Sequence, residues 1–553
     1  MLRVLAPEDF LSEHDLPFSQ RIQRISSSLR RLDAQEVGRD FALDPTDRLV
    51  KSTVSLCPKC LAHVPAAVFE RTGRVLLRSR CTEHGDSQAV VENDARYYHV
   101  SSQDRAGRVY DATRILHVPT YSVPGQSPCC EGGRCESPGE RDGEHEHMGE
   151  LDRNRQSGLS ELSGLSGPSG LSGPSGLSGP SGLRDPSGRS LGSDQLRNKS
   201  CTVLVEVTNA CNLKCTVCYS DARGDRIIPH RELERHINAL AETKGGLDSV
   251  QLTGGEALLH PDAFTIIEAL CRNSLIKKVY LPTNGLELAR GELPEKLARF
   301  RDKLMVLLQF DGVSDRVDET MRGATPLRLR HRVIDTLGKL GVHMQLTMTL
   351  ARGVNEDQVG EVIDLGLRHN HIKVIALQPA TYSGRYELEP DPMNRLTLSD
   401  IVKAVADQSG KKTRASDFVP IPCSHPNCGW ITVFLRRFGL VHNVVRHVDM
   451  DKMREPVAYK TLLSTRELKH VVGSRHAFGP TAILGRLARR VVRSQDMFTI
   501  AIKPFMDRFN YDHDRVANCC HHLMDTRGVL TSFCEYNALL RQQDPWDRFP
   551  VLA

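Results

Sequence analysis

The sequence predicts an α/β protein built around a partial (β/α)6 barrel, with a small cysteine-bearing domain before it and a cysteine-rich domain after it. Two observations support this fold class: a regular alternation of strand-like and helix-like segments, and groups of cysteines on both sides of that alternation. The helix-like stretches, such as RELERHINALAETK and PDAFTIIEALCRN, repeat apolar residues three and four apart. Strands separated by helices form right-handed βαβ units and hence a parallel sheet. The expected strands are 202–208, 249–254, 278–283, 305–310, 343–350 and 373–379.

The composition is that of a soluble globular protein. The chain has 553 residues, of which 39% are hydrophobic and 25% charged, and its net charge of +5 gives no support to a nucleic-acid partner. The start, MLRVLAPEDFLSEHD, lacks the apolar run of a signal peptide. No stretch approaches the roughly 18 apolar residues of a membrane-spanning helix. We therefore expect a cytoplasmic protein, in which 16 cysteines are better explained as metal ligands than as disulfides.

Composition divides the chain into four expected parts. A segment poor in large apolar residues contains the run SGLSGPSGLSGPSGLSGPSGL, and we predict that it is a disordered insertion. A collagen-like helix is excluded because glycine does not recur at a strict period of three. The parts are an N-terminal cysteine-bearing domain (1–120), the insertion (121–199), the core (200–400) and a C-terminal cysteine-rich domain (401–553).

Three cysteines follow the first expected strand directly. In VEVTNACNLKCTVCYSDA they are Cys211, Cys215 and Cys218. By themselves they are compatible with a disulfide knot, a zinc site, an iron–sulfur site or coincidence. Chemistry in such sheets gathers at the carboxyl ends of strands, and three further motifs occupy that place after the next strands. These motifs are TGGEALLHPD (253–262), PTNGLEL (282–288) and LQFDGVSD (308–315).

Taken together, these motifs resemble the radical S-adenosylmethionine (radical SAM) superfamily, whose signature is three cysteines with this spacing. The resemblance implies a radical SAM barrel in which Cys211, Cys215 and Cys218 hold three irons of a [4Fe–4S] cluster. Thiolates are soft ligands suited to such a cluster. The fourth iron is then left for the amino and carboxylate groups of S-adenosylmethionine, which an electron from the cluster cleaves to a 5′-deoxyadenosyl radical.

The same resemblance implies a set of cofactor-binding residues. Gly254 and Gly255 lack side chains, so that a ligand can approach the backbone closely. The Gly254–Glu256 stretch is expected to hydrogen-bond the methionine amino group. Val217 is expected to pack on adenine. No catalytic residue beyond the cluster is assigned. The expected cofactor-binding residues are Val217, Thr253, Gly254, Gly255, Glu256, Asn284 and Asp311.

Two further groups of cysteines flank the core. Cys57, Cys60 and Cys81, with His84, have the spacing of a structural Cys₃His zinc site. We favour an auxiliary iron centre there, with zinc as the alternative. The second group is expected to hold auxiliary iron–sulfur and comprises Cys423, Cys428, Cys519, Cys520 and Cys534.

These flanks carry a narrower resemblance. The segments CPKC…CTEHG, LLQFDG, PCSHPNC and CCHH…FCEYN together resemble the tetraether lipid synthase group, which includes relatives that methylate a pterin. The resemblance implies that C–C coupling of lipid chains is the leading function. The alternatives are radical methylation or other modification of a small molecule or peptide, and a non-catalytic iron–sulfur redox scaffold. A scaffold would not need the GGE motif for methionine.

The expected partners follow from this chemistry. They are a small-molecule or lipid substrate and an electron donor such as flavodoxin or ferredoxin. Arg486, Arg489, Arg490 and Arg493 lie in a partly amphipathic pattern, which could rest on the inner face of a membrane. A packed helix with a solvated basic edge is the alternative for that stretch.

Overall fold

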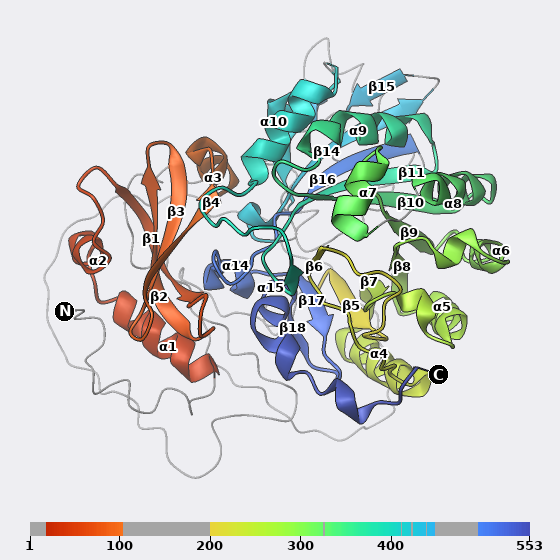
Figure 1. Ribbon diagram of the computed structural model, residues 1–553, viewed down its shortest axis with the longest axis horizontal. Helices are drawn as coiled ribbons and strands as arrows, with labels where there is room; N and C mark the ends of the chain where they lie inside the picture. The colour runs from red at the N-terminus through yellow and green to blue at the C-terminus, as the bar shows by residue number, and fades with distance from the viewer. Residues whose placement is uncertain are drawn as a thin grey trace, which may run out of the picture. The chain divides into compact units, whose positions relative to one another are not determined.

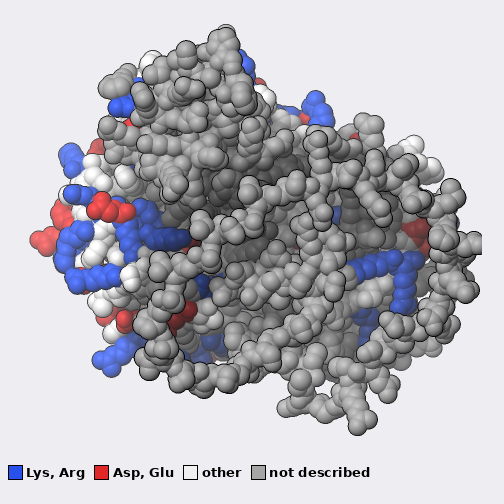
Figure 2. All heavy atoms as spheres, turned by 180° about the vertical axis from the view of Figure 1, so that it is seen from behind, with Lys and Arg blue, Asp and Glu red and all other residues white. Residues whose placement is uncertain are grey.

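The computed structural model describes residues 18–102 and 200–552, except 324–326, 411, 422–423, 438–439 and 448–495. The predicted insertion, the arginine-rich stretch around Arg489 and Cys423 therefore lie outside the described residues. Within them, no helix is both long enough and apolar enough to cross a membrane. At the left edge of Figure 2, basic and acidic side chains of the described residues are interspersed.

An antiparallel sheet forms the amino-terminal domain (Figure 1). Its strands pair in chain order, and β2 and β3 are joined by a tight turn in which Thr72 and Gly73 both have positive φ (48° and 76°), as the twist of a two-residue hairpin requires. The strands are β1 (Arg48–Leu56), β2 (His63–Arg71), β3 (Arg74–Cys81) and β4 (Gly85–Glu92), and the helices are α1 (Phe18–Leu29), α2 (Ala34–Asp40) and α3 (Ala95–Ser102).

The core is a parallel sheet, as the sequence predicts. All six expected strands are present, adjacent and in chain order, and each pairs in parallel with the next. This confirms the α/β fold class and the partial barrel. The strands are β5 (Thr202–Glu206), β7 (Leu247–Thr253), β8 (Ile276–Thr283), β9 (Leu304–Gln309), β10 (His343–Leu350) and β11 (Ile372–Pro379).

Amphipathic helices link these strands and cover the outside of the sheet (Figure 1). In α4, the residues Leu233, Ile237 and Ala241 are buried at a spacing of four, and Gly245 ends the helix in the left-handed conformation (φ 67°). The helices are α4 (His230–Lys244), α5 (Ala263–Arg272), α6 (Leu293–Ala298), α7 (Asp315–Arg322), α8 (Leu327–Lys339), α9 (Val359–Arg368) and α10 (Leu398–Gln408).

Strands from the last part of the chain extend this sheet at both edges. β16 (Met497–Ile502) pairs in parallel with β11, and β14 (Trp430–Arg437) pairs with β16 in antiparallel fashion. At the other edge, β17 (His521–Met524) pairs in parallel with β5 and carries β18 (Leu530–Ser532). The boundary drawn at residue 400 from composition therefore does not divide the sheet, because residues on both sides of it share one ladder of strands.

Short elements complete the C-terminal part and the region above the barrel. β6 pairs with β12 in antiparallel fashion and thereby joins the cysteine-bearing segment to the segment after β11. The elements are β6 (Val217–Cys218), β12 (Arg385–Tyr386), β13 (Val419–Pro420), β15 (Leu440–Asn443), α14 (His513–Ala517), α15 (Phe533–Glu535) and a π-helical turn (Tyr536–Leu540).

Candidate functional site

A cavity of about 920 Å³ lies inside the barrel and contains the three cysteines of the first motif. Cys211, Cys215 and Cys218 follow β5 and line its wall, together with side chains from the carboxyl ends of the neighbouring strands. The cavity also reaches side chains from the C-terminal part, such as Lys503 and Phe505. The structure thus brings the cysteine motif and the strand-end motifs into one space, as parallel strands require.

The two glycines after β7 pack against the backbone of the cysteine loop (residues 207–218). A Cβ atom on Gly254 would overlap the carbonyl oxygen of Thr208, and one on Gly255 would overlap that of Ala210. The N–H of Gly255 donates to Thr208 O and the N–H of Glu256 to Ala210 O, both at 2.9 Å. The glycines are therefore needed for contact between two protein segments, in addition to the ligand approach that the sequence suggested.

Glu256 connects the strand ends around the cavity. Its carboxylate accepts from the backbone N–H of Asn284 at 2.8 Å and from that of Leu258 at 3.3 Å. The Asn284 side chain in turn donates to Asn212 of the cysteine loop at 2.7 Å. Burial raises the pKa of Glu256 to about 7. Because an ammonium group only donates hydrogen bonds, a methionine ammonium would find its acceptors in the backbone carbonyls and carboxylate oxygens of this stretch.

Asp311 lies behind the cavity wall, where it binds Arg322. Its carboxylate accepts from Arg322 Nε at 2.6 Å and Nη2 at 2.9 Å, and from the N–H of Thr349 at 2.9 Å. Arg322 lines the cavity and donates to the carbonyl of Val217 at 3.2 Å. Asp311 does not line the cavity itself, and its oxygens hold the arginine that reaches the cysteine loop. The cofactor contact expected of Asp311 stays a prediction.

Arg322 is a residue that sequence reasoning missed. Despite its burial, Asp311 and Cys215 hold its pKa above the ordinary value, so that a permanent positive charge stands beside the thiols. The only local signal was an arginine just before Gly323, the glycine that ends α7. Its partner stands 11 residues earlier in the chain, and nothing in the sequence pattern shows the pairing.

An aromatic wall connects the cysteine loop with the C-terminal cysteines. Tyr219, Phe505, His521 and Phe533 form it, and all four line the cavity. Ring centroids lie 5.2 Å apart for Tyr219 and Phe533, 4.6 Å for Phe505 and Phe533, and 5.5 Å for His521 and Phe533. Because Tyr219 follows Cys218 and Phe533 precedes Cys534, the wall spans the distance between the two sets of thiols.

Three of the C-terminal cysteines form a second group of thiols, which we call the C-terminal thiol group: Cys428, Cys519 and Cys534. The pKa of Cys534 is raised by burial and by the nearby Cys519 and Cys428, and that of Cys519 is raised to about 11, chiefly by burial. Cys520, in contrast, packs against Cys201 and Ile421. The metal role expected of Cys520 stays a prediction, and Cys423 lies outside the described residues.

N–H donors point at each sulfur of the C-terminal thiol group. Met506 N donates to Cys534 Sγ and His521 N to Cys519 Sγ, both at 3.3 Å, and Arg515 Nε donates to Cys428 Sγ at 3.4 Å. Although burial alone would raise the pKa of Cys428, Arg515 and His425 lower it to about 7. Buried thiols supplied with such donors are suited to act as thiolate ligands of an iron–sulfur centre.

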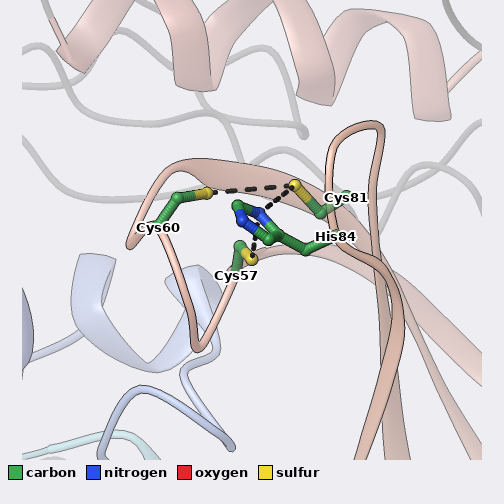
Figure 3. Close-up of side chains that lie close together, drawn as sticks. All are labelled: Cys57, Cys60, Cys81 and His84. Atoms are coloured by element: carbon green, nitrogen blue, oxygen red, sulfur yellow. Dashed lines mark hydrogen bonds between the residues drawn. The ribbon is translucent and has the colours of Figure 1, made fainter.

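The amino-terminal domain holds a compact group of four metal-ligand side chains (Figure 3). Cys57 and Cys60 lie in the loop after β1, Cys81 is the last residue of β3, and His84 lies in the turn between β3 and β4. The two sulfurs of Cys60 and Cys81 are 3.9 Å apart, and Nδ1 of His84 lies 3.7 and 3.6 Å from the sulfurs of Cys57 and Cys81. A tetrahedral zinc site separates its sulfurs by about 3.8 Å, so the geometry fits a single zinc ion.

The contact of Gly255 with the cysteine loop leads to a prediction. Replacing Gly255 with alanine should displace the loop, and a shift of about 1 Å is expected to lower S-adenosylmethionine cleavage roughly 100-fold. Iron per chain and 5′-deoxyadenosine formation measure this effect. Gly38→Ala, at a site with open space around the glycine, is the matched control. Full iron content and normal cleavage in Gly255→Ala would contradict the proposed geometry.

The C-terminal thiol group leads to a second prediction. Cys534→Ser should lose iron, because it removes a thiol whose sulfur accepts a hydrogen bond inside that group. Cys520→Ser should keep its iron, because Cys520 packs elsewhere. Iron analysis of the two variants decides the question, and equal iron in both would show that Cys534 is only a buried thiol.

Comparison with known proteins identifies two segments. Residues 205–366 match the radical SAM superfamily, and residues 49–93 match the HMPTM N-terminal zinc ribbon domain. The second match favours zinc, the alternative at Cys57, Cys60 and Cys81, over the preferred iron, since the matching family is a zinc ribbon.

Relatives extend the likeness to most of the chain. The 7,8-dihydro-6-hydroxymethylpterin dimethyltransferase of Methanocaldococcus jannaschii is 24% identical over 546 residues, which cover 89% of this chain and 94% of that protein. The antilisterial bacteriocin subtilosin biosynthesis protein AlbA of Bacillus subtilis is 28% identical over 163 residues, 29% of this chain and 34% of that protein.

Among solved structures, SuiB of Streptococcus suis bound to its precursor peptide SuiA aligns with 38% of this chain and 46% of its own, at 18% identity and a TM-score of 0.33. The sequence motifs, the parallel barrel and the matched segment agree: residues 205–366 form a radical SAM domain, and the chain is a radical S-adenosylmethionine enzyme.

Proposed function

We propose that this enzyme methylates a small heterocyclic molecule of the pterin type by radical chemistry. The observation that carries the proposal is the match to a pterin dimethyltransferase over nearly the full length of both chains. Because the match includes the zinc ribbon and the C-terminal part as well as the barrel, it extends well beyond the shared radical SAM domain. Methylation, the alternative drawn from the sequence, therefore takes precedence over lipid coupling.

The residues around the cavity fit the cofactors of this reaction. Three thiols in one loop, the tight glycine contact behind them and the buried Arg322 beside Cys215 form a suitable cradle for a [4Fe–4S] cluster. When bound, the cluster and S-adenosylmethionine supply an electron and a radical able to activate a C–H bond. The protein's own part is to hold both groups and the substrate in one closed space.

Polar side chains on the inner face of the barrel support a hydrogen-bonding substrate. Gln251 on β7 and Gln378 on β11 line the cavity, and their amides have no hydrogen-bond partner among the described residues. An amide presents both donors and acceptors, which is what the edge of a pterin ring requires. A saturated lipid tail would leave these groups unpaired, at a cost in binding energy.

The aromatic wall suits the flat face of the same ring. Phe505 and Phe533 lie in contact, with ring centroids 4.6 Å apart, and both line the cavity. Aromatic rings bind planar partners by offset stacking or edge contacts. A heterocycle held against this wall would lie next to the cysteine loop, because Tyr219 of the wall directly follows Cys218.

The proposal predicts a specific product. Reconstituted, reduced enzyme incubated with S-adenosylmethionine, a dihydropterin and a separate methyl donor (a second S-adenosylmethionine or a reduced one-carbon carrier) should form a methylated pterin and 5′-deoxyadenosine, as detected by mass spectrometry. The separate donor is needed because the cleaved S-adenosylmethionine keeps its methyl group on methionine. Gln378→Leu should raise KM for the pterin roughly 3–10-fold, since one hydrogen bond contributes about 0.5–1.5 kcal/mol. The exposed Gln542→Leu is the matched control.

Two results would contradict the proposal. One is S-adenosylmethionine cleavage with no methylation of any pterin supplied. The other is formation of coupled chains from a lipid extract, which would support the hypothesis that the enzyme couples lipid chains.

The zinc ribbon should hold one zinc ion through Cys57, Cys60, Cys81 and His84. We expect purified protein to contain about one zinc per chain, and Cys81→Ser to lose it together with stability of the amino-terminal domain, because metal binding is coupled to folding. Metal analysis and thermal unfolding test this. Iron in place of zinc at this site, in protein produced with both metals available, would favour the original iron preference instead.

A further inference from the structure

A buried lysine of the amino-terminal domain contacts the C-terminal part of the chain. Lys51 on β1 is almost completely buried, and its Nζ lies 2.7 Å from both Asp512 Oδ2 and Asp514 Oδ2. Thr53, two residues along the same strand, donates to Asp512 Oδ1 at 2.8 Å. Although burial alone would lower it, the two carboxylates hold the pKa of Lys51 well above its usual value, so the lysine is charged.

The two aspartates belong to the element that reaches Cys428. Asp512 caps α14, and Asp514 and Arg515 lie in its first turn. Asp514 Oδ2 lies 3.7 Å from His425 Nε2, and Arg515 Nε donates to Cys428 Sγ at 3.4 Å. The carboxylates thus stand between the lysine and the two basic groups that neighbour the sulfur.

His425 also shapes the turn that carries Cys428. Its Nδ1 accepts from the backbone N–H of Asn427 at 3.1 Å, and the N–H of Cys428 is bonded to the carbonyl of His425 at 2.8 Å. A movement of His425 would therefore move the cysteine. The contact between Asp514 and His425 ties this turn to α14.

The same strand meets the C-terminal thiol group through apolar packing. Leu56, the last residue of β1, is fully buried in one cluster with Phe533 and Cys534. The next residue is Cys57 of the zinc ribbon. β1 therefore connects the metal ligands of the zinc ribbon, which begin directly after the strand, with the C-terminal thiol group. Leu56 makes this contact on one side of the strand, and Lys51 with Thr53 makes it on the other.

We propose that Lys51 is a positioning residue for the C-terminal thiol group, acting through Asp514, Arg515 and His425 on Cys428. The inference rests on that group being a metal centre, as the sequence predicts. Lys51 neutralises Asp512 and Asp514. Without it, two buried carboxylates would draw Arg515 and His425 toward themselves and away from the sulfur, because unpaired buried charges are costly. The zinc ribbon is then a support for a metal site in a distant part of the chain.

The test uses full-length protein in which Cys211, Cys215 and Cys218 are all replaced by alanine, so that the remaining iron reports the C-terminal thiol group. Lys51→Met in this background should weaken iron retention against the chelator bathophenanthroline by about 10–100-fold, the effect typical of groups that orient metal ligands. Asp514→Asn should cause a similar loss. If the two act through one chain of contacts, the double variant should lose no more iron than the worse single variant.

A matched control separates positioning from general loosening between the domains. Lys403 also joins the core to the amino-terminal domain, since its Nζ lies 2.8 Å from Asp94 Oδ2. Lys403→Met should weaken iron retention far less than Lys51→Met, because among the described residues Lys403 reaches the turn that carries Cys428 only through the rings of Tyr97 and Trp430, with no charged group in the path. Zinc content and circular dichroism of each variant show that the zinc ribbon and the fold persist.

Several outcomes would overturn the inference. Iron retention equal to that of the parent in both Lys51→Met and Asp514→Asn would do so, as would an equal loss in Lys403→Met. If Lys51→Met does not fold, Asp514→Asn alone decides the result. Absence of iron from the background protein would overturn both the inference and the metal role of the thiol group. Pterin methylation by the unmodified enzyme is measured separately, so that failure of this inference can be distinguished from failure of the proposed function.

Discussion

The close contact between the cysteine loop and the end of β7 is the constraint on which the site depends. The loop can hold three sulfurs around one cavity only if its backbone lies directly on the neighbouring strand end, and the side-chain-free Gly254 and Gly255 allow this. The backbone N–H groups of Gly255 and Glu256 then hold the loop through two hydrogen bonds of 2.9 Å each. The other strand ends are connected to the same loop, through Asn284 on one side and Arg322 on the other.

Around this contact the chain places one set of thiols in the cavity, while Cys534 of the second set directly follows Phe533 of the cavity's aromatic wall. The parallel sheet brings the first set to the carboxyl ends of its strands, and the C-terminal strands β16 and β17 extend the same sheet at its edges. The C-terminal thiol group is therefore built onto the barrel itself. The aromatic wall includes the sequence neighbour of one cysteine from each set, since Tyr219 follows Cys218 and Phe533 precedes Cys534.

Two features of the barrel interior support the proposed pterin substrate over a lipid chain. Inward-facing positions on β7 and β11 carry glutamines, which bind polar partners, and the wall at the barrel top carries aromatic rings. A long saturated chain gains little from an amide, whereas a flat heterocycle uses both features. The near full-length match to a pterin dimethyltransferase also supports the proposal of a flat heterocyclic substrate.

The sequence by itself determined the strands, their order and the cysteine motif, because these depend on local periodicity and on spacing within a few residues. The six strands and the strand-end motifs are local patterns of this kind. Tertiary structure decided which distant residues meet. Cys519 and Cys520 are neighbours in sequence, yet Cys519 joins Cys428 and Cys534 while Cys520 packs against Cys201. Asp311 pairs with Arg322, and Lys51 pairs with carboxylates more than 450 residues away. Such pairings depend on how the sheet edges and the amino-terminal domain pack, and charge or spacing along the chain does not encode that packing.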